Sequence, residues 1–482
     1  MLAKNLGELK KTNYKVKSIH EEIRDNLIQK ISNKEKTFEG IFGYEDTVIP
    51  DVERALLSGH NILLLGLRGQ AKTRIARLMI HLLDENIPII KGSEVNDDPF
   101  NPISKYGREQ ILQHGDNTPI SWIHRDDRYV EKLATPDVSI ADLLGDLDPI
   151  KAATKKIDFS DEYAIHFGLI PRSNRSIFVI NELPDLQTRI QVALFNILEE
   201  NDLQIRGFKL KLPLNLLFVF TANPEDYTQR GNIITPLKDR IESQILTHYP
   251  EDIATALNIT FQEAQINLEK KKKIFIPELL AQILENISFS ARESELVDQK
   301  SGVSARLSIS ALELLYSAVE RRLLINKESK GIARLSDFIS IVPALTGKIE
   351  LVYEGEQLGA YEVALTIINE AIVQVAKTIL PKIESKKKIN TNPYALTSDW
   401  FNKGNIIQLD VNQSEKKYMS ILNGIPLNKD LISRFNKNEQ NFAIELILHY
   451  IASTNTIQKE WVDQRIVFKD PLASMLSDLN IE

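Results

Sequence analysis

Apolar residues form short continuous runs in the first half of the chain and recur at helical spacing in the second half. Continuous runs bounded by polar or turn residues are typical of strands buried in a parallel sheet. The candidate strands are residues 61–65, 86–90, 176–180 and 216–221. Because helix-patterned segments separate them, we expect a parallel three-layer α/β domain over about residues 41–250.

Three further regions flank this domain. Residues 1–40 are charged and helix-patterned, with EEIRDNLIQKI as the clearest helix. Helical spacing dominates about residues 251–380, which predicts an all-α domain. The segment PKIESKKKINTNP then indicates a linker, since a lysine run followed by Asn and Pro opposes regular structure. Residues 391–482 contain a strand-like NIIQLDV and a helix-like FAIELILHYIAS, so we expect a small C-terminal domain.

A long insertion, roughly residues 92–172, separates the second and third candidate strands. Its first half is polar and rich in turn residues, and its second half contains TPDVSIADLLGDLDPIK. A loop of this length in a compact domain usually carries structure or function of its own. The sequence does not indicate the role of residues 92–135.

The first candidate strand runs directly into a glycine-containing turn and a helix-patterned segment. The turn reads Gly66-Leu67-Arg68-Gly69-Gln70-Ala71-Lys72-Thr73. This order predicts a phosphate-binding loop, in which backbone N–H groups and the helix N-terminus face phosphate oxygens. Lys72 would contact the β- and γ-phosphates of ATP, and Thr73 would bind Mg²⁺.

Ala71 stands where the last glycine of such a loop normally lies. A methyl group fits there if φ is negative and the backbone need not approach the nucleotide more closely. An ordinary strand-to-helix turn is the alternative interpretation. The offsets of the two glycines, the lysine and the threonine favour the phosphate loop.

The third candidate strand ends in Asn181 and Glu182, where a P-loop ATPase carries its second acidic motif. The carboxyl edge of a parallel sheet is where such folds bind ligands, so Glu182 would polarise a water in line with the γ-phosphate. Asn181 replaces an expected aspartate. Its amide accepts a hydrogen bond from a metal-bound water but supplies no charge, so we expect a weaker Mg²⁺ site. A solvated strand-end carboxylate is the alternative for Glu182.

Three later residues are further candidates. Asn223 follows the fourth candidate strand and would hold the attacking water; an Asx-turn before Pro224 is its alternative. Arg240, in TPLKDRI, would reach the nucleotide of a neighbouring subunit, since a guanidinium is permanently charged and matches phosphate. A surface salt bridge with Asp239 or Glu242 is its alternative. Arg306 opens a helix and would lean over the phosphates, or it is simply exposed.

Composition narrows the function classes. The chain has 482 residues, enough for two or three domains, and a net charge of −7, which disfavours nucleic acid and anionic membranes as partners. It has no cysteine, which excludes disulfides, thiol catalysis and cysteine zinc sites and suits a cytoplasmic protein. The N-terminus lacks a signal-peptide pattern, and we expect no membrane span.

Together these motifs resemble the AAA+ ATPases over about residues 41–350. More narrowly, the chain resembles the MoxR and magnesium-chelatase I-subunit branch. The segments that carry this narrower resemblance are FGLIPR at 167–172, DLQIRGFKL at 202–210, which looks like an inserted β-hairpin, and DLLGD at 142–146. Ala71, Asn181 and the insert 92–135 depart from the family pattern, and the first two put the rate of hydrolysis in doubt.

The resemblance implies an ATP-hydrolysing ring, usually a hexamer, with ATP and Mg²⁺ at subunit interfaces. It also implies chaperone-like remodelling of a partner, often one with a von Willebrand A domain. Asp137-Val138-Ser139-Ile140-Ala141 lacks the second serine of the metal-adhesion motif of that domain. Such a partner is therefore expected to be a separate chain.

Two alternatives stay open. Ala71 and Asn181 would also suit a nucleotide-binding switch or scaffold that hydrolyses little or no ATP. A DNA-directed AAA+ protein is disfavoured by the net charge of −7 and by the lack of a DNA-binding motif in the C-terminal region. The Gly-Ala-Phe-Thr-Gly-Ala loop expected of sigma-54 activators is also absent.

Overall fold

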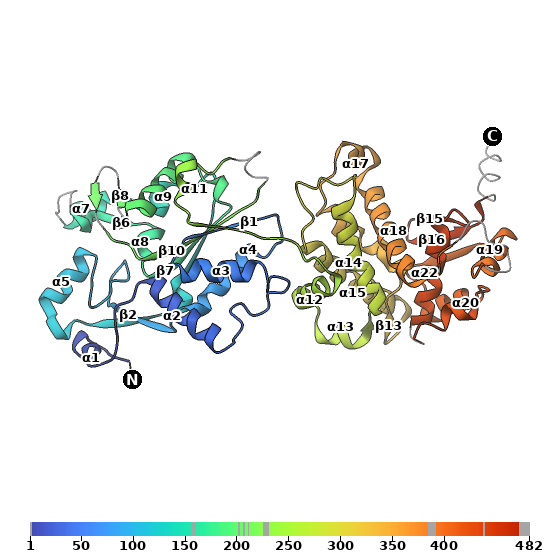
Figure 1. Cartoon of the computed structure of the whole chain (residues 1–482), viewed down its shortest axis with the longest axis horizontal. Helices are drawn as coiled ribbons and strands as arrows, with labels where there is room; N and C mark the ends of the chain where they lie inside the picture. Colours follow the sequence, from blue (N-terminus) through green and yellow to red (C-terminus); the bar gives the residue numbers. More distant parts are fainter. Residues whose placement is uncertain are drawn as a thin grey trace. The chain divides into compact units, whose positions relative to one another are not determined.

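The chain forms two compact units, Met1–His248 and Tyr249–Glu482 (Figure 1). This computed structural model describes residues 2–155, 161–200, 203–205, 208–210, 212–224, 231–383, 392–436 and 439–471. In that part of the chain no helix is both long and apolar enough to cross a lipid bilayer.

A five-stranded parallel sheet forms the centre of the first unit. Its strand order is β11 (Ser243–Leu246), β1 (Ile62–Leu65), β10 (Leu216–Ala222), β7 (Ser176–Asn181) and β4 (Tyr129–Leu133). Every residue of β1, β7 and β10 is buried, as their continuous apolar runs predict. The expected parallel α/β fold is therefore confirmed.

Alternate strand residues belong to two hydrophobic cores on the opposite faces of this sheet. Ile62 and Leu64 of β1 belong to one core with residues of α2, α3 and α4. Leu63 and Leu65 belong to the other core with residues of α9 and α11. The first unit is therefore three-layered. Its helices are α1 (Leu6–Lys10), α2 (Ile19–Ser32), α3 (Val48–Leu57), α4 (Lys72–Leu78), α5 (Lys105–His114), α6 (Ile140–Leu143), α7 (Pro149–Lys155), α8 (Leu169–Arg172), α9 (Thr188–Glu200) and α11 (Thr235–Asp239).

The candidate strand at 86–90 is confirmed as a strand, but its expected place in the parallel sheet is wrong. As β2 (Asn86–Ile90) it pairs antiparallel with β3 (Ile120–His124) in a separate two-stranded sheet. The central sheet instead takes its edge strands from β4 and β11. Edge strands are partly solvated and need no continuous apolar run, and for that reason the hydrophobic pattern did not predict them.

Two small antiparallel pairs complete the first unit. β5 (Gly145–Leu147) pairs with β6 (Ile165–Phe167) inside the long insertion. β8 (Leu203–Ile205) pairs with β9 (Phe208–Leu210), so the hairpin expected at 202–210 is present in the described strands.

The N-terminal helix α2 packs into the first unit. Ile19, Ile23 and Leu27 join the core beside the sheet. On the same helix, Glu22 receives two hydrogen bonds of 2.6 Å from the guanidinium of Arg128, and both side chains are buried. Two paired charges with this geometry fix the helix against the insertion.

The second unit is mostly helical, and helices are present throughout the region where helical spacing predicted them. They are α12 (Ile253–Glu263), α13 (Leu268–Lys273), α14 (Glu278–Glu293), α15 (Arg306–Asn326), α16 (Val342–Thr346), α17 (Tyr353–Leu358), α18 (Ala360–Ile379), α19 (Ala395–Asn402), α20 (Glu415–Asn423), α21 (Lys429–Ile432) and α22 (Gln440–Ala452). β12 (Ile274–Phe275) pairs with β13 (Gly331–Ile332). An antiparallel sheet follows, with β16 (Arg465–Lys469) between β14 (Ile407–Asp410) and β15 (Gln458–Val462).

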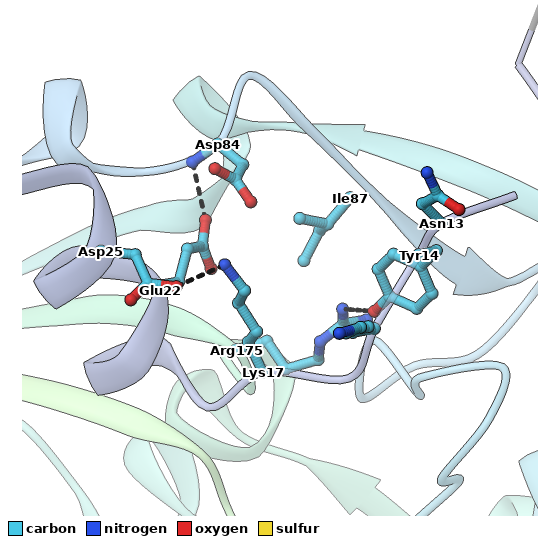
Figure 2. Close-up of a pocket in the computed structure, with 9 residues that line it drawn as sticks. Asn13, Tyr14, Lys17, Glu22, Asp25, Asp84, Ile87 and Arg175 are labelled. Atoms are coloured by element: carbon cyan, nitrogen blue, oxygen red, sulfur yellow. Dashed lines mark hydrogen bonds and ion pairs between the residues drawn. The ribbon is translucent and has the colours of Figure 1, made fainter. Parts of the chain in front are cut away.

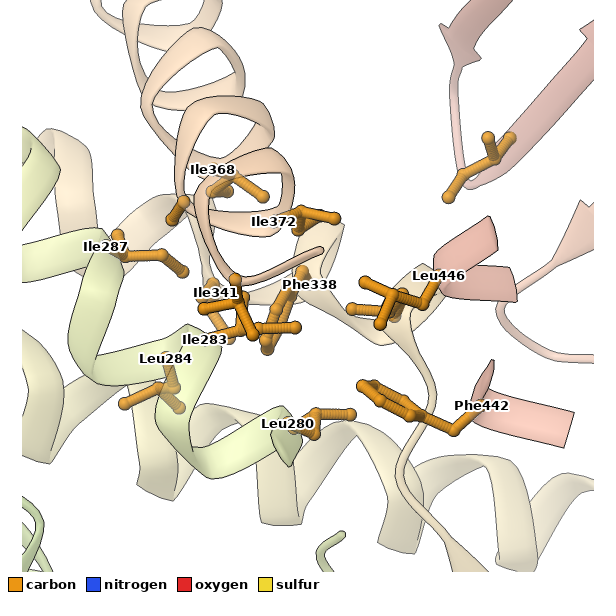
Figure 3. Packing of buried hydrophobic residues seen from close by; sticks show 14 of the residues in the cluster. Leu280, Ile283, Leu284, Ile287, Phe338, Ile341, Ile368, Ile372, Phe442 and Leu446 are labelled. Carbon is orange, nitrogen blue, oxygen red and sulfur yellow. The ribbon is translucent and has the colours of Figure 1, made fainter. Parts of the chain in front are cut away.

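One hydrophobic cluster runs through the whole second unit. Figure 3 shows Leu280 and Ile283 of α14, Ile372 of α18 and Phe442 and Leu446 of α22 gathered around a common centre. The described residues of the predicted helical and C-terminal regions, up to Phe468, therefore share one core.

Candidate nucleotide-binding site

The glycine-containing loop joins β1 to α4 at the carboxyl edge of the central sheet. Leu65, the last residue of β1, pairs with Ala222, and the N–H of Gly66 donates to the carbonyl of Ala222 over 3.2 Å. A Cβ at Gly66 would lie 2.0 Å from Thr247 Oγ1 and 2.2 Å from Gln70 Oε1. Only glycine fits this position, because any side chain would collide with the groups that hold the loop.

The loop is held in place from behind by Gln70. Its buried side chain accepts a hydrogen bond of 2.8 Å from Thr247 Oγ1, just beyond β11. The hydroxyl of Tyr44 donates to the Gln70 carbonyl at 3.0 Å and to the His248 carbonyl at 2.7 Å. These contacts fix the loop backbone, which would present the N–H groups to phosphate oxygens.

Ala71 has a φ of +55°, in the left-handed region. The expectation that the methyl group is accommodated by a negative φ is therefore wrong. The chain leaves Gly69 with φ +76° and enters α4 at Lys72, and this tight reversal needs a second left-handed residue at 71. Left-handed geometry costs a non-glycine residue roughly 1–2 kcal/mol, so the loop holds a strained residue.

Lys72 is the first residue of α4, and its side chain is buried within the loop. The ammonium donates to the carbonyl of Gly66 and, over 2.9 Å, to that of Leu67. The positive charge is therefore held inside the loop that would surround the phosphates. Gly69 lies in the same turn, and Arg68 beside it is exposed.

Thr73 and Asn181 come together as the sequence predicts. Thr73 Oγ1 donates to Asn181 Oδ1 at 3.3 Å, and Thr221 Oγ1 of the adjacent strand donates to the same oxygen at 3.1 Å. Asn181 is only 7% exposed. Two oxygen ligands of the type that Mg²⁺ prefers thus face each other at the end of the phosphate loop.

Sequence reasoning missed Glu131, which completes this cluster. Glu131 lies on β4, and its Oε1 accepts a hydrogen bond of 2.6 Å from Asn181 Nδ2. Arg77 of α4 holds the same carboxylate through contacts of 2.8 and 3.0 Å. This hydrogen bonding from Arg77 is the main reason that the pKa of Glu131 lies below its usual value. No sequence signal marked Glu131, because β4 itself was not predicted.

Glu182 and Asn223 also lie at this edge of the sheet. Glu182 follows β7 directly, with φ +57°, and its N–H donates to Thr221 Oγ1 over 3.2 Å. Asn223 follows Ala222 on the neighbouring strand and is 4% exposed. The structure thus gathers the candidates from the loop and from both strand ends in one place.

The candidate arginines lie outside this cluster of contacts. Arg240 caps the end of α11, where it pairs with Glu199 of α9 and, at 2.8 Å, with Asp239. The expected alternative, a surface salt bridge with Asp239, is thus present, and Arg240 is 38% exposed. Arg306 begins α15 in the second unit and is exposed. Arg206 and Arg230, the alternatives to Arg240 for a role across a subunit interface, lie outside the described residues.

A separate polar cavity of about 510 Å³ lies near the opposite edge of the sheet (Figure 2). Arg175, which directly precedes β7, lines this cavity. Its guanidinium donates a hydrogen bond of 2.8 Å to the hydroxyl of Tyr14. The charges around it pair with one another, as Lys17 does with Asp25 at 2.5 Å. Because the phosphate loop is at the carboxyl ends of the strands, this cavity is not part of the nucleotide site.

The parallel sheet and the loop after its β1 strand define a P-loop α/β core, as the sequence predicts. No protein-family model matches the sequence. No curated protein matches it either.

Several solved structures are similar at low identity. One is a Cytophaga hutchinsonii ATCC 33406 protein described only provisionally as an ATPase, with 18% identity over 73% of this chain and 95% of that chain and a TM-score of 0.28. A second is the complex between magnesium chelatase subunits BchI and BchD, with 19% identity. The match covers 67% of this chain and 98% of that chain, with a TM-score of 0.35. A third is NtrX from Brucella abortus in complex with ATP, with 13% identity. The match covers 74% of this chain and 69% of that chain, with a TM-score of 0.36. The fold class assigned above rests on the sheet and the loop themselves.

Proposed function

We propose that this protein binds ATP with Mg²⁺ at the phosphate loop and hydrolyses it. The observation that carries the proposal is the meeting of Thr73 and Asn181 at the mouth of the loop, beside Glu182. A structural strand-to-helix turn needs no contact between a hydroxyl and an amide oxygen at its end, with a glutamate next in the chain.

The residues fit such a ligand. Bound Mg²⁺ would offset the negative charge of the β- and γ-phosphates. Thr73 would hold the metal directly, and Asn181 would accept a hydrogen bond from a water on it. Lys72 would neutralise phosphate charge from inside the loop. The carboxylate of Glu182 would orient the attacking water and take its proton, and Asn223 would hold that water.

We further propose that the protein works as a ring of the MoxR and magnesium-chelatase type, hexameric, cytoplasmic and acting on a separate protein partner. The family motifs in the sequence support this extension. In such a ring, Arg240 would reach the nucleotide of the next subunit, and Arg306 would contact the nucleotide from the helical region. A partner with a von Willebrand A domain would suit this type of ATPase.

One observation favours a second function, a nucleotide-binding switch with little hydrolysis. The residue on the metal side, Asn181, is neutral, and the nearby carboxylate of Glu131 is already bound by Arg77. Both features reduce the negative charge available to Mg²⁺. Rates of hydrolysis with and without Mg²⁺ separate the two functions.

The proposal is tested by two variants. Lys72→Ala should weaken ATP binding about 10- to 100-fold, because a charge-assisted contact is worth roughly 1.5–3 kcal/mol. Glu182→Gln should bind ATP normally and hydrolyse it on the order of 100-fold more slowly. Nucleotide titration and phosphate release measure the two effects. Unchanged affinity in Lys72→Ala would exclude the phosphate loop, and unchanged turnover in Glu182→Gln would exclude the general base.

A further inference from the structure

The second unit contains a cavity of about 560 Å³ between α18, α22 and β15. These elements are labelled at the C-terminal end of the chain in Figure 1. The cavity is formed by residues of the second unit and lies outside the proposed nucleotide site. The residues that matter here are Asn369, Glu370, Lys377, His449, Gln458 and Lys459.

Lys459 occupies a position on β15 that faces the core. It pairs with Phe468 of β16, so the two side chains lie on the same face of the sheet, and Phe468 is fully buried. An amphipathic strand normally carries an apolar residue at such a position. A lysine there indicates that the cavity needs an amine.

The amine of Lys459 contacts only neutral groups among the described residues. Its Nζ donates to Asn369 Oδ1 at 2.5 Å and lies 3.1 Å from His449 Nδ1. Burial lowers the pKa of Lys459 to about 7, and no carboxylate compensates for it. Buried charged groups are usually paired with an opposite charge. The Lys459 amine has only neutral partners, so it lacks the expected counter-ion.

His449 also lines this cavity, and one of its ring nitrogens is buried without a hydrogen-bond partner in the described chain. The side chain is fully buried, and burial holds the pKa of its ring well below the usual value, so the ring is neutral. When Lys459 donates to Nδ1, the ring proton is on Nε2, and Nε2 has no hydrogen-bond partner in the described chain. Gln458 Oε1 is unpartnered too. Buried groups left in this state cost stability unless a ligand or water satisfies them.

We propose that this cavity binds a small oxyanion, a carboxylate or a phosphate group, with the ammonium of Lys459 as its counter-ion. Lys377 of α18 is a second cation in the lining. The acidic residue in the lining is Glu370, and burial raises the pKa of its carboxyl. The lining thus carries two amines, Lys377 and Lys459, against one carboxyl group, and this balance favours an anion over a cation. The site is independent of the proposed ATPase function.

Amine labelling of the full-length protein at pH 7.5, read residue by residue by mass spectrometry, tests this proposal. An amine with a lowered pKa is more often unprotonated and reacts readily, so Lys459 should be labelled and a bound oxyanion should protect it. Acetate and inorganic phosphate are the two probes, and protection by one or both identifies the kind of oxyanion. The phosphate loop also binds phosphate, so Lys72 is followed in the same spectra.

Lys459→Met should weaken binding of the protecting probe at least about tenfold by calorimetry, because it removes the counter-ion. Lys417→Met, at an exposed lysine of α20 outside the lining, is the matched control and should leave binding unchanged within about twofold. Binding should also weaken as the pH rises through 7, since Lys459 loses its charge and neither Glu370 nor His449 gains positive charge over that range. Lack of protection of Lys459 by either probe, or equal effects of the two variants, would overturn the proposal.

Discussion

At the scale of single residues, the pair Asn181 and Glu131 defines the metal side of the proposed nucleotide site. The amide nitrogen of Asn181 donates to Glu131 at 2.6 Å, and this contact turns the amide oxygen toward the hydroxyls of Thr73 and Thr221. Glu131 is thus a positioning residue for Asn181. The neutral Asn181 therefore has a carboxylate beside it, that of Glu131 on the neighbouring strand β4.

This arrangement predicts how an aspartate would behave at position 181. Asn181→Asp would place two carboxylates where a hydrogen bond of 2.6 Å now lies, so Mg²⁺-dependent nucleotide binding should weaken despite the added charge. The double variant Asn181→Asp, Glu131→Gln should recover it, since the hydrogen bond can form again. We expect a coupling of roughly 1–3 kcal/mol from titrations of all four proteins. Additive effects would contradict the role assigned to Glu131.

A second prediction at this scale concerns the strained loop residue. Ala71→Gly should stabilise the first unit by about 1 kcal/mol, because glycine adopts a φ of +55° without the steric cost. Denaturant unfolding measures the change. Ala305→Gly is the control, since Ala305 has φ −56° and gains nothing from glycine. Equal effects of both substitutions would show that Ala71 is not strained.

At the scale of elements, helix α22 carries a carboxyl group into the core of the second unit. Glu445 is fully buried and accepts hydrogen bonds from Tyr418 at 2.6 Å and from the N–H of Leu335 at 3.1 Å. Burial raises its pKa from 4.5 to about 7. Between about pH 4.5 and 7, the Glu445 carboxyl is therefore protonated in the folded protein and ionised in the unfolded chain.

This shift predicts a pH-dependent stability with a defined sign. The folded state binds the extra proton, so Glu445 lowers stability as the pH rises from about 4.5 to about 7, and the loss persists above that. Glu445→Gln should remove roughly 2–4 kcal/mol of this pH dependence. Urea unfolding at several pH values measures it, with the exposed Glu362→Gln as control. Parallel pH curves for Glu445→Gln and the parent would contradict the prediction.

At the scale of the whole molecule, Arg240 links the single chain to the proposed ring. In the isolated chain it pairs with Glu199 and Asp239. An arginine that serves a neighbouring subunit must exchange these exposed partners for phosphate, which is inexpensive because exposed salt bridges contribute little. The surface pairs therefore do not exclude a role across an interface.

Mixing experiments test that role. Arg240→Ala should bind ATP but hydrolyse it roughly 1,000-fold more slowly, and Glu182→Gln should be inactive for a different reason. Mixed rings contain some interfaces with both residues intact, so mixing should restore part of the activity. Phosphate release is measured on rings whose composition is confirmed by mass. If confirmed mixed rings stay inactive, Arg240 does not act across the interface, and Arg206 and Arg230 become the candidates.

The sequence alone determined the phosphate loop, the buried central strands and the helices of the second unit. These features depend on local chemistry: glycine at tight turns, continuous apolar runs in strands with two buried faces, and helical spacing of apolar residues. The sequence also singled out Lys72, Thr73, Asn181 and Glu182 as candidates, because each stands at the end of such an element.

Only the tertiary structure decided which distant residues meet. Glu131 and Asn181 are 50 positions apart, and they contact each other because β4 pairs with β7. Asn369 and Lys459 are 90 positions apart and meet through the packing of α18 and β15 around one cavity. The φ of Ala71 follows from the tight reversal of the chain between Gly69 and the start of α4. Strand register, helix packing and loop closure bring these groups together, and none of them leaves a local pattern in the sequence.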